Sequence, residues 1–151
     1  MITQKDISDK IIKSFNLIKG ETPLYHIVIN PREVIHIGDL RFNTNVYLHS
    51  LMRNYQYKFK PIKFLFVIEY SGDISKGIEA DINRLGEHVH LLLSTDLNVE
   101  VIKSEFYTTF KGLSNTHFER IDNHQDINNF YNYLIKQEKY FSKDSVRTNL
   151  N

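Results

Sequence analysis

Apolar residues recur along this chain with two periods, and the change of period divides it into helices and strands. Helical spacing predicts helices over Ile7–Lys19, Asn43–Phe59, Val99–Phe110 and from Asp122 or Asn123 to about Phe141. Short apolar runs bounded by turn residues predict strands over Leu24–Ile29, Phe64–Tyr70, His88–Ser94 and His117–Ile121. The predicted order is helix, strand, helix, strand, strand, helix, strand, helix.

This order predicts an α+β fold, with a central antiparallel sheet of about four or five strands flanked by helices. Residues 64–94 read as two strands of a hairpin joined by a long polar connection. A length of 151 residues suits one domain, so we expect residues 1–151 to form a single unit. The polar segment from about Ser142 is expected to be a frayed tail.

Composition removes several classes of function. The chain has no cysteine, which excludes disulfides, thiolate catalysis and cysteine-based zinc sites. Its first residues do not resemble a signal peptide, and its longest apolar runs, such as Phe64–Ile68, are too short to cross a bilayer. We therefore expect a cytoplasmic protein with no membrane partner.

The net charge of +1 does not by itself indicate a nucleic-acid-binding protein. One stretch is locally basic, because four cations follow one another with no acid between them: Arg53, Lys58, Lys60 and Lys63. A mixed, solvated surface is the plainer interpretation of the charge pattern.

Two histidines, His88 and His90, lie two residues apart within an apolar strand-like run. Residues i and i+2 of a strand point to the same face, so the two imidazoles are expected to reach one point in space. Two neutral imidazoles form half of a divalent-metal site. A purely structural role would require other buried polar partners for both rings. The opposite face of the strand is expected to be core and carries Val89, Leu91 and Leu93.

A carboxylate stands close to the histidines in the predicted hairpin. Glu69 ends the preceding strand, and pairing of the two strands places it beside the imidazoles. Two imidazoles and one carboxylate leave open positions on a hard divalent ion for phosphate oxygens. A strand-end glutamate that faces water is the alternative.

The last predicted helix carries a second stripe beside its core stripe, formed by Tyr133, Lys136, Gln137 and Tyr140. A nearby ammonium favours the phenolate form of Tyr133, which is the form that attacks phosphorus. Two other tyrosines compete for this role: Tyr131 on the core stripe, and Tyr140 two turns further along. The alternative is an ordinary amphipathic helix with a surface tyrosine.

Together these motifs resemble the HUH endonuclease superfamily. That superfamily is named for two histidines flanking a hydrophobic residue, here His88-Val89-His90. Its single-tyrosine branch carries Tyr-x-x-Lys on a C-terminal helix, which Tyr133 and Lys136 match. The resemblance runs from about residue 24 to residue 140.

The resemblance implies a DNA endonuclease and strand transferase that cleaves single-stranded DNA or a DNA hairpin at an origin. It implies that Tyr133 forms a 5′-phosphotyrosine intermediate and that Lys136 offsets the developing negative charge. It also implies Mg²⁺ or Mn²⁺ as cofactor, held by His88, His90 and Glu69, with Gln137 as the alternative third ligand.

Two branches of the superfamily compete. The acid-ended strand Phe66–Tyr70 and the Tyr-x-x-Lys motif are similar to a rolling-circle replication initiator (Rep) of a plasmid or virus, which would depend on a separate helicase. The alternative is a single-strand transposase of an insertion sequence, because Gln137 follows the tyrosine by four residues. The short turn at Asp122 and Asn123 favours a monomer, although a dimer stays open. A non-catalytic DNA-binding or structural α+β protein is the further alternative.

Overall fold

The computed structural model describes residues 3–31, 37–55, 61–70, 87–111, 114–137 and 145–150. These ranges contain four helices and five strands. In chain order they are α1 (Gln4–Ile18), β1 (Leu24–Pro31), α2 (Ile37–Tyr55), β2 (Lys63–Tyr70), β3 (Glu87–Ser94), α3 (Val99–Phe110), β4 (Ser114–Ile121), α4 (His124–Gln137) and β5 (Val146–Thr148). The predicted order is confirmed up to α4, and β5 is added to it.

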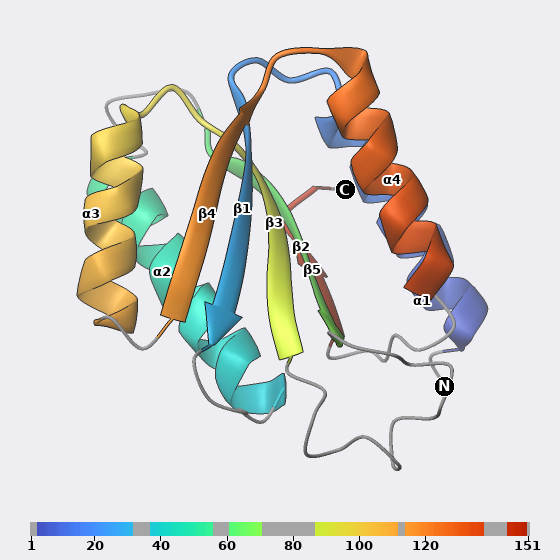
Figure 1. The fold of residues 1–151 in the computed structure, drawn as a ribbon, viewed down its shortest axis with the longest axis horizontal. Helices are drawn as coiled ribbons and strands as arrows, with labels where there is room; N and C mark the ends of the chain where they lie inside the picture. Colours follow the sequence, from blue (N-terminus) through green and yellow to red (C-terminus); the bar gives the residue numbers. More distant parts are fainter. Residues whose placement is uncertain are drawn as a thin grey trace.

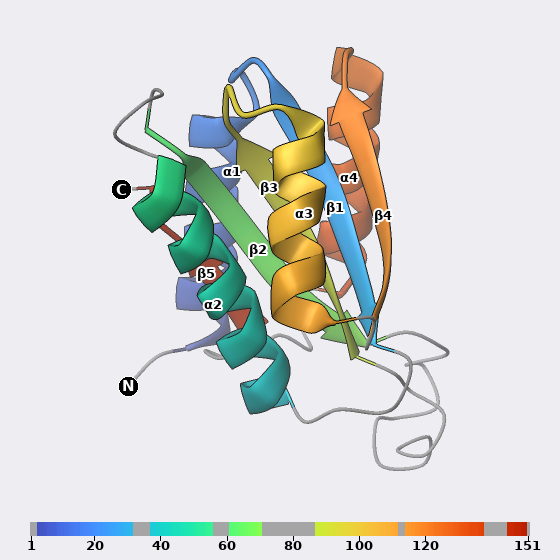
Figure 2. The same cartoon turned by 90° about the vertical axis from the view of Figure 1, so that its left-hand side faces the viewer.

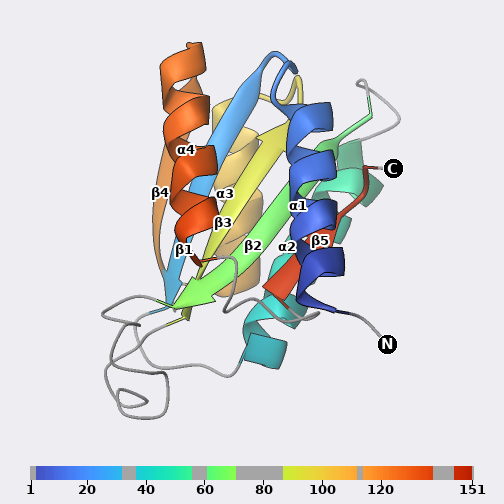
Figure 3. The same cartoon turned by 90° about the vertical axis from the view of Figure 1, so that its right-hand side faces the viewer.

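The five strands form one sheet in the order β4-β1-β3-β2-β5, and every neighbouring pair is antiparallel. Helices α2 and α3 cover one face of this sheet, and α1 and α4 cover the other (Figure 1). Figure 2 shows the face under α2 and α3, and Figure 3 shows the face under α1 and α4. The predicted α+β sheet flanked by helices is therefore confirmed.

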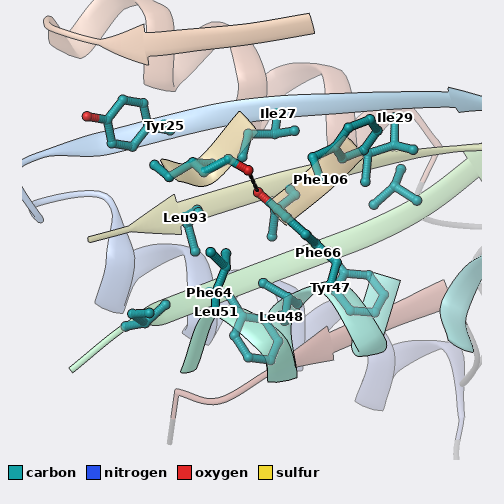
Figure 4. Close-up of a cluster of buried hydrophobic side chains, with 14 of the residues drawn as sticks. Tyr25, Ile27, Ile29, Tyr47, Leu48, Leu51, Phe64, Phe66, Leu93 and Phe106 are labelled. Atoms are coloured by element: carbon teal, nitrogen blue, oxygen red, sulfur yellow. Dashed lines mark hydrogen bonds between the residues drawn. The ribbon is translucent and has the colours of Figure 1, made fainter. Parts of the chain in front are cut away.

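Both faces of the sheet are packed with apolar side chains, because alternate residues of each strand point to opposite sides. The larger cluster joins the sheet to α2 and α3, and Figure 4 shows part of it. Within it, the hydroxyl of Tyr47 donates to the carbonyl oxygen of Ile102 at 2.9 Å, and Figure 4 shows this bond as a dashed line. The second cluster lies under α1 and α4 and includes Phe15, Leu92 and Phe130. The histidine-bearing face of β3 is thus also a core face.

Polar caps explain where three helices begin. Thr3 and Asp6 form a reciprocal capping box at α1, with backbone-to-side-chain bonds of 2.9 and 3.1 Å. Asn98 caps α3 by accepting from the backbone N–H of Glu100. Asn123, one of the two residues at which the sequence predicted the last helix to begin, does the same for α4 by accepting from the N–H of Asp126.

Helix α2 begins earlier than predicted, at Ile37 instead of Asn43. Within it, Tyr47 is fully buried, whereas the apolar side chain of Val46 is 38% exposed. The buried Tyr47 ring packs against Phe106 and Phe110 of α3, so contact with another helix decides which side faces inward. No helix in the described ranges combines the length and apolar character needed to span a membrane.

The prediction of a frayed tail from about Ser142 is wrong for its last part. Val146–Thr148 forms β5, which pairs with the open edge of β2. Val146 is 2% exposed and joins the core under α1. The hydroxyl of Thr148 donates to the carbonyl oxygen of Phe64 at 2.8 Å, and Arg41 donates to that of Val146 at 3.0 Å. Residues 138–144 lie outside the described part of the chain.

Candidate metal centre

Two neighbouring strands, β2 and β3, place the predicted ligands on the face under α1 and α4. Glu69 of β2 lies directly opposite His88 of β3 in the antiparallel register. His90 follows two residues later on β3 and therefore points to the same side. The predicted hairpin pairing, and the position of Glu69 beside the histidines, are both present.

The ligand atoms of these three residues converge on one point. The Nε2 atom of His88 lies 2.9 Å from Oε1 of Glu69 and 3.1 Å from Nε2 of His90. The Nε2 atom of His90 contacts the same carboxylate oxygen. All three side chains are buried, with exposed fractions of 1% for Glu69, 7% for His88 and 8% for His90. Such a buried polar group requires a compensating partner.

The charge state of this cluster suits a cation. Burial by itself raises the pKa of the Glu69 carboxyl, but hydrogen bonding and charge interactions with His88 and His90 outweigh burial, and the net pKa is lowered. The carboxylate is therefore anionic at neutral pH. Two nitrogen lone pairs and an anionic oxygen repel one another at these distances unless a proton or a cation lies between them.

The donor set fits a divalent metal ion. Two imidazole nitrogens and one carboxylate oxygen are ligands that first-row divalent ions and Mg²⁺ accept. Two further atoms of the cluster, Oε2 of Glu69 and Nδ1 of His88, are buried and have no hydrogen-bond partner among the described residues. This group of three can thus hold a metal ion through its buried ligand atoms.

A fourth residue, His26 of β1, contacts this cluster. Its Nε2 atom lies 2.8 Å from Nδ1 of His90, and the two rings stack with centroids 5.0 Å apart. Burial and the neighbouring charges of His90 and His117 lower the pKa of His26 to about 3, although Glu69 acts in the opposite direction. The ring is therefore neutral at pH 7. From the sequence, His26 could be either a core residue or a residue that lines the site. Its contact with His90 was not predicted, because the neighbouring position of β1 and β3 is not visible in the sequence.

Helix α4 lies against the same cluster. The ring of Phe130 packs edge-on against His26 at 4.8 Å and against His90 at 5.9 Å between centroids. Tyr131 packs on Phe15 at 4.7 Å, which agrees with its prediction on the core side. Tyr133 follows Phe130 by three residues, so its backbone lies about one helical turn further along.

Other predicted residues lie beyond what the structure describes. The side chains of Tyr133, Lys136 and Gln137 fall outside the described part of α4, and Tyr140 lies in the range 138–144. Their predicted roles as nucleophile, charge partner and alternative ligand stay predictions.

An open pocket of about 350 Å³ borders the cluster on the side of β1 and β4. One wall of the pocket is formed by the rings of His26, His90 and Phe130. The other wall is polar and is formed by Glu119, Asp126 and Asn129. Because His90 belongs to both the pocket and the cluster, a molecule in this pocket lies next to the candidate metal centre.

The comparisons with known proteins concern the fold. No protein-family model matches the chain, and no curated protein matches it in sequence. Among solved structures, the crystal structure of the hypothetical protein ORF119 from Sulfolobus islandicus rod-shaped virus 1 is similar, with a TM-score of 0.53 and 18% sequence identity. The match covers 88% of this chain and 97% of that one. The arrangement of sheet and helices described here therefore resembles that of a viral protein.

Proposed function

We propose that this protein nicks and rejoins single-stranded DNA through a tyrosine nucleophile. The observation that supports this best is the convergence of Glu69, His88 and His90 on one buried point, on the face of the sheet that α4 covers. A cation between strands and a tyrosine on the facing helix are the two parts that such a reaction requires.

Glu69, His88 and His90 would hold Mg²⁺ or Mn²⁺. When bound, the ion supplies Lewis-acid polarisation of the scissile phosphodiester. Glu69 contributes the negative charge that retains a divalent cation, and the Nε2 atoms of the two imidazoles, which lie beside its Oε1 atom, would complete the ligand set. Burial of the three side chains limits water at this point, which strengthens each electrostatic interaction made there.

Tyr133 is the proposed nucleophile. Its phenolate oxygen forms a bond to phosphorus while the bond from phosphorus to the 3′ oxygen breaks. The 5′ phosphate remains on the tyrosine, and the 3′ oxygen leaves as a hydroxyl after it takes up a proton. One diester is exchanged for another, so the reverse reaction rejoins the strand without an added energy source. Lys136, one turn along the helix, favours the phenolate by its charge.

The pocket beside His90 favours a single strand over a duplex. Carboxylate and amide groups of Glu119, Asp126 and Asn129 can bond the Watson–Crick edge of a base, and that edge is accessible only in an unpaired strand. The two carboxylates also disfavour a phosphate at this position. We therefore place a base in the pocket and the neighbouring phosphate at the cluster.

We favour a replication initiator of a virus or plasmid over an insertion-sequence transposase. Glu69 lies beside the two histidines and so takes the place of the third ligand. In the transposase, Gln137 would take that place. The similarity in fold to a protein of a rod-shaped virus agrees with a viral setting.

The test is covalent capture. The protein is incubated with Mn²⁺ and a pool of labelled single-stranded and hairpin oligonucleotides, and label that withstands denaturation is located by peptide mass spectrometry. We expect label on Tyr133, its loss in Tyr133→Phe, and its retention in the matched control Tyr131→Phe, whose ring still packs on Phe15. Label on Tyr131 or Tyr140 would contradict the choice of nucleophile. An absence of adduct in a protein that binds Mn²⁺ and DNA would favour a non-catalytic DNA-binding module.

A further inference from the structure

The two ring nitrogens of His90 face different partners. Its Nε2 atom lies 3.1 Å from Nε2 of His88 and contacts Glu69, whereas its Nδ1 atom lies 2.8 Å from Nε2 of His26. His90 therefore joins the candidate ligand cluster to a residue outside it.

The chemistry of imidazole connects these two contacts. A neutral ring binds a cation through one nitrogen only if the proton is on the other nitrogen. A cation held by Nε2 of His90 thus requires a proton on Nδ1, and this N–H is buried. A buried N–H without an acceptor costs free energy, and the Nε2 lone pair of a neutral His26 lies within hydrogen-bond distance as an acceptor.

The surroundings of His26 hold it in place for this contact. His26 pairs with Leu92 in the sheet, so its ring is the diagonal neighbour of His90 on the same face. The ring stacks on His90 and receives the edge of Phe130. Strand pairing, stacking and helix packing each restrict its orientation.

We propose that His26 is a positioning residue for the candidate metal centre: its Nε2 accepts the Nδ1 proton of His90 and thereby holds Nε2 of His90 toward the ion. This inference rests on the metal centre of the proposed function but needs neither Tyr133 nor DNA. The two candidate histidine ligands differ in this respect, because Nδ1 of His88 has no hydrogen-bond partner among the described residues.

Calorimetric titration with Mn²⁺, in the absence of DNA, tests the proposal. Loss of such a supporting partner typically weakens metal affinity by about 10–100-fold, and we expect this for His26→Phe, which keeps a ring beside Phe130 but has no acceptor. His26→Gln offers an amide oxygen as acceptor and should recover part of the affinity. His49→Ala is the control, because His49 is exposed on α2, on the other side of the sheet.

Two further measurements distinguish the loss of a positioning contact to His90 from general damage to the fold. Thermal melting of the Phe and Gln variants without metal should be similar, so that only the acceptor distinguishes them. Nitrogen-15 spectra of the Mg²⁺-loaded wild type should show the His90 proton on Nδ1, and that signal should be lost or shifted in His26→Phe.

Equal Mn²⁺ affinity in the wild type and His26→Phe would overturn the inference while leaving the metal centre in place. Failure of the wild type to bind Mn²⁺ would overturn both. A third outcome would refute only the proposed DNA chemistry: no DNA adduct forms, but Mn²⁺ affinity still falls from the wild type to His26→Gln and then to His26→Phe.

Discussion

Acidification should destabilise this protein through His26 in particular. The pKa of this imidazole is 6.5 in its ordinary state and about 3 in the folded protein. Between these two values the unfolded chain binds one more proton at His26 than the folded chain does. The free energy of unfolding therefore falls as pH falls, by about 1.4 kcal/mol for each pH unit. Because the unfolded imidazole is only half protonated at pH 6.5, moving from pH 6.5 to pH 4.5 should remove roughly 2 kcal/mol.

The comparison of wild type with His26→Phe isolates this contribution. Phenylalanine does not titrate, and it keeps an aromatic ring against Phe130. The pKa of Glu69 is lowered in the folded protein, so the stability that its ionised carboxylate contributes is lost only below about pH 4.5, the ordinary pKa of this group. Glu69 therefore contributes little to the difference between the two proteins in this interval. Urea unfolding, followed by circular dichroism at pH 6.5 and 4.5, gives the free energy of unfolding for each protein at each pH.

We expect the wild type to lose roughly 2 kcal/mol more than His26→Phe over this interval. The control His49→Ala, which removes an exposed imidazole, should follow the wild type. Parallel losses in the wild type and His26→Phe, within about 0.5 kcal/mol, would show that His26 titrates freely in the folded state and would refute the burial argument.

Four further predictions concern the metal, the nucleophile and the edge of the sheet. Chelation by EDTA should abolish nicking but lower the melting temperature by only a few degrees in a thermal scan, since the apolar clusters need no metal; collapse of the fold would indicate a structural site. His88→Ala should remove most Mn²⁺ binding in calorimetry, and Glu69→Ala should be more damaging than Gln137→Ala; the reverse order would move the third ligand to α4. A mixture of Tyr133→Phe and His88→Ala proteins should not regain nicking of a single-stranded oligonucleotide, because we expect each monomer to carry a complete site; recovered activity would mean a site shared between subunits. Truncation after residue 144 should lower the free energy of unfolding by roughly 2 kcal/mol or more in urea, because Val146 leaves the core; unchanged stability would mean that β5 contributes nothing.

How far the site was predictable depends on the sequence separation of its parts. Glu69 and His88 are 19 residues apart on strands that follow one another, so strand periodicity and hairpin pairing were enough to bring them together. His26 and His90 are 64 residues apart, and their contact depends on β1 lying beside β3. Period and turn chemistry do not specify the order of strands in a sheet, so this partner was not predictable.

The elements that sequence reasoning missed also depend on distant contacts. β5 has three residues and one buried apolar side chain, Val146, which is too little for any alternation to be seen. It is a strand because the edge of β2 is available to pair with it. The burial of Tyr47 also depends on a distant contact, because its hydroxyl donates a hydrogen bond to the carbonyl oxygen of Ile102 on α3. Propensity is local, whereas these outcomes depend on tertiary contacts.

The strand order has a consequence for how the protein folds. The β2–β3 pair closes the shortest loop in the described sheet, and it carries all three candidate metal ligands. The contact of His26 with His90 closes a separation of 64 residues, and that of Thr148 with Phe64 closes one of 84. Because the entropy cost of closure grows with loop length, we expect the hairpin to be structured in the folding transition state before β1 and β5 join it. The candidate ligands would then meet early, and His26 and the C-terminal strand would enclose them afterwards.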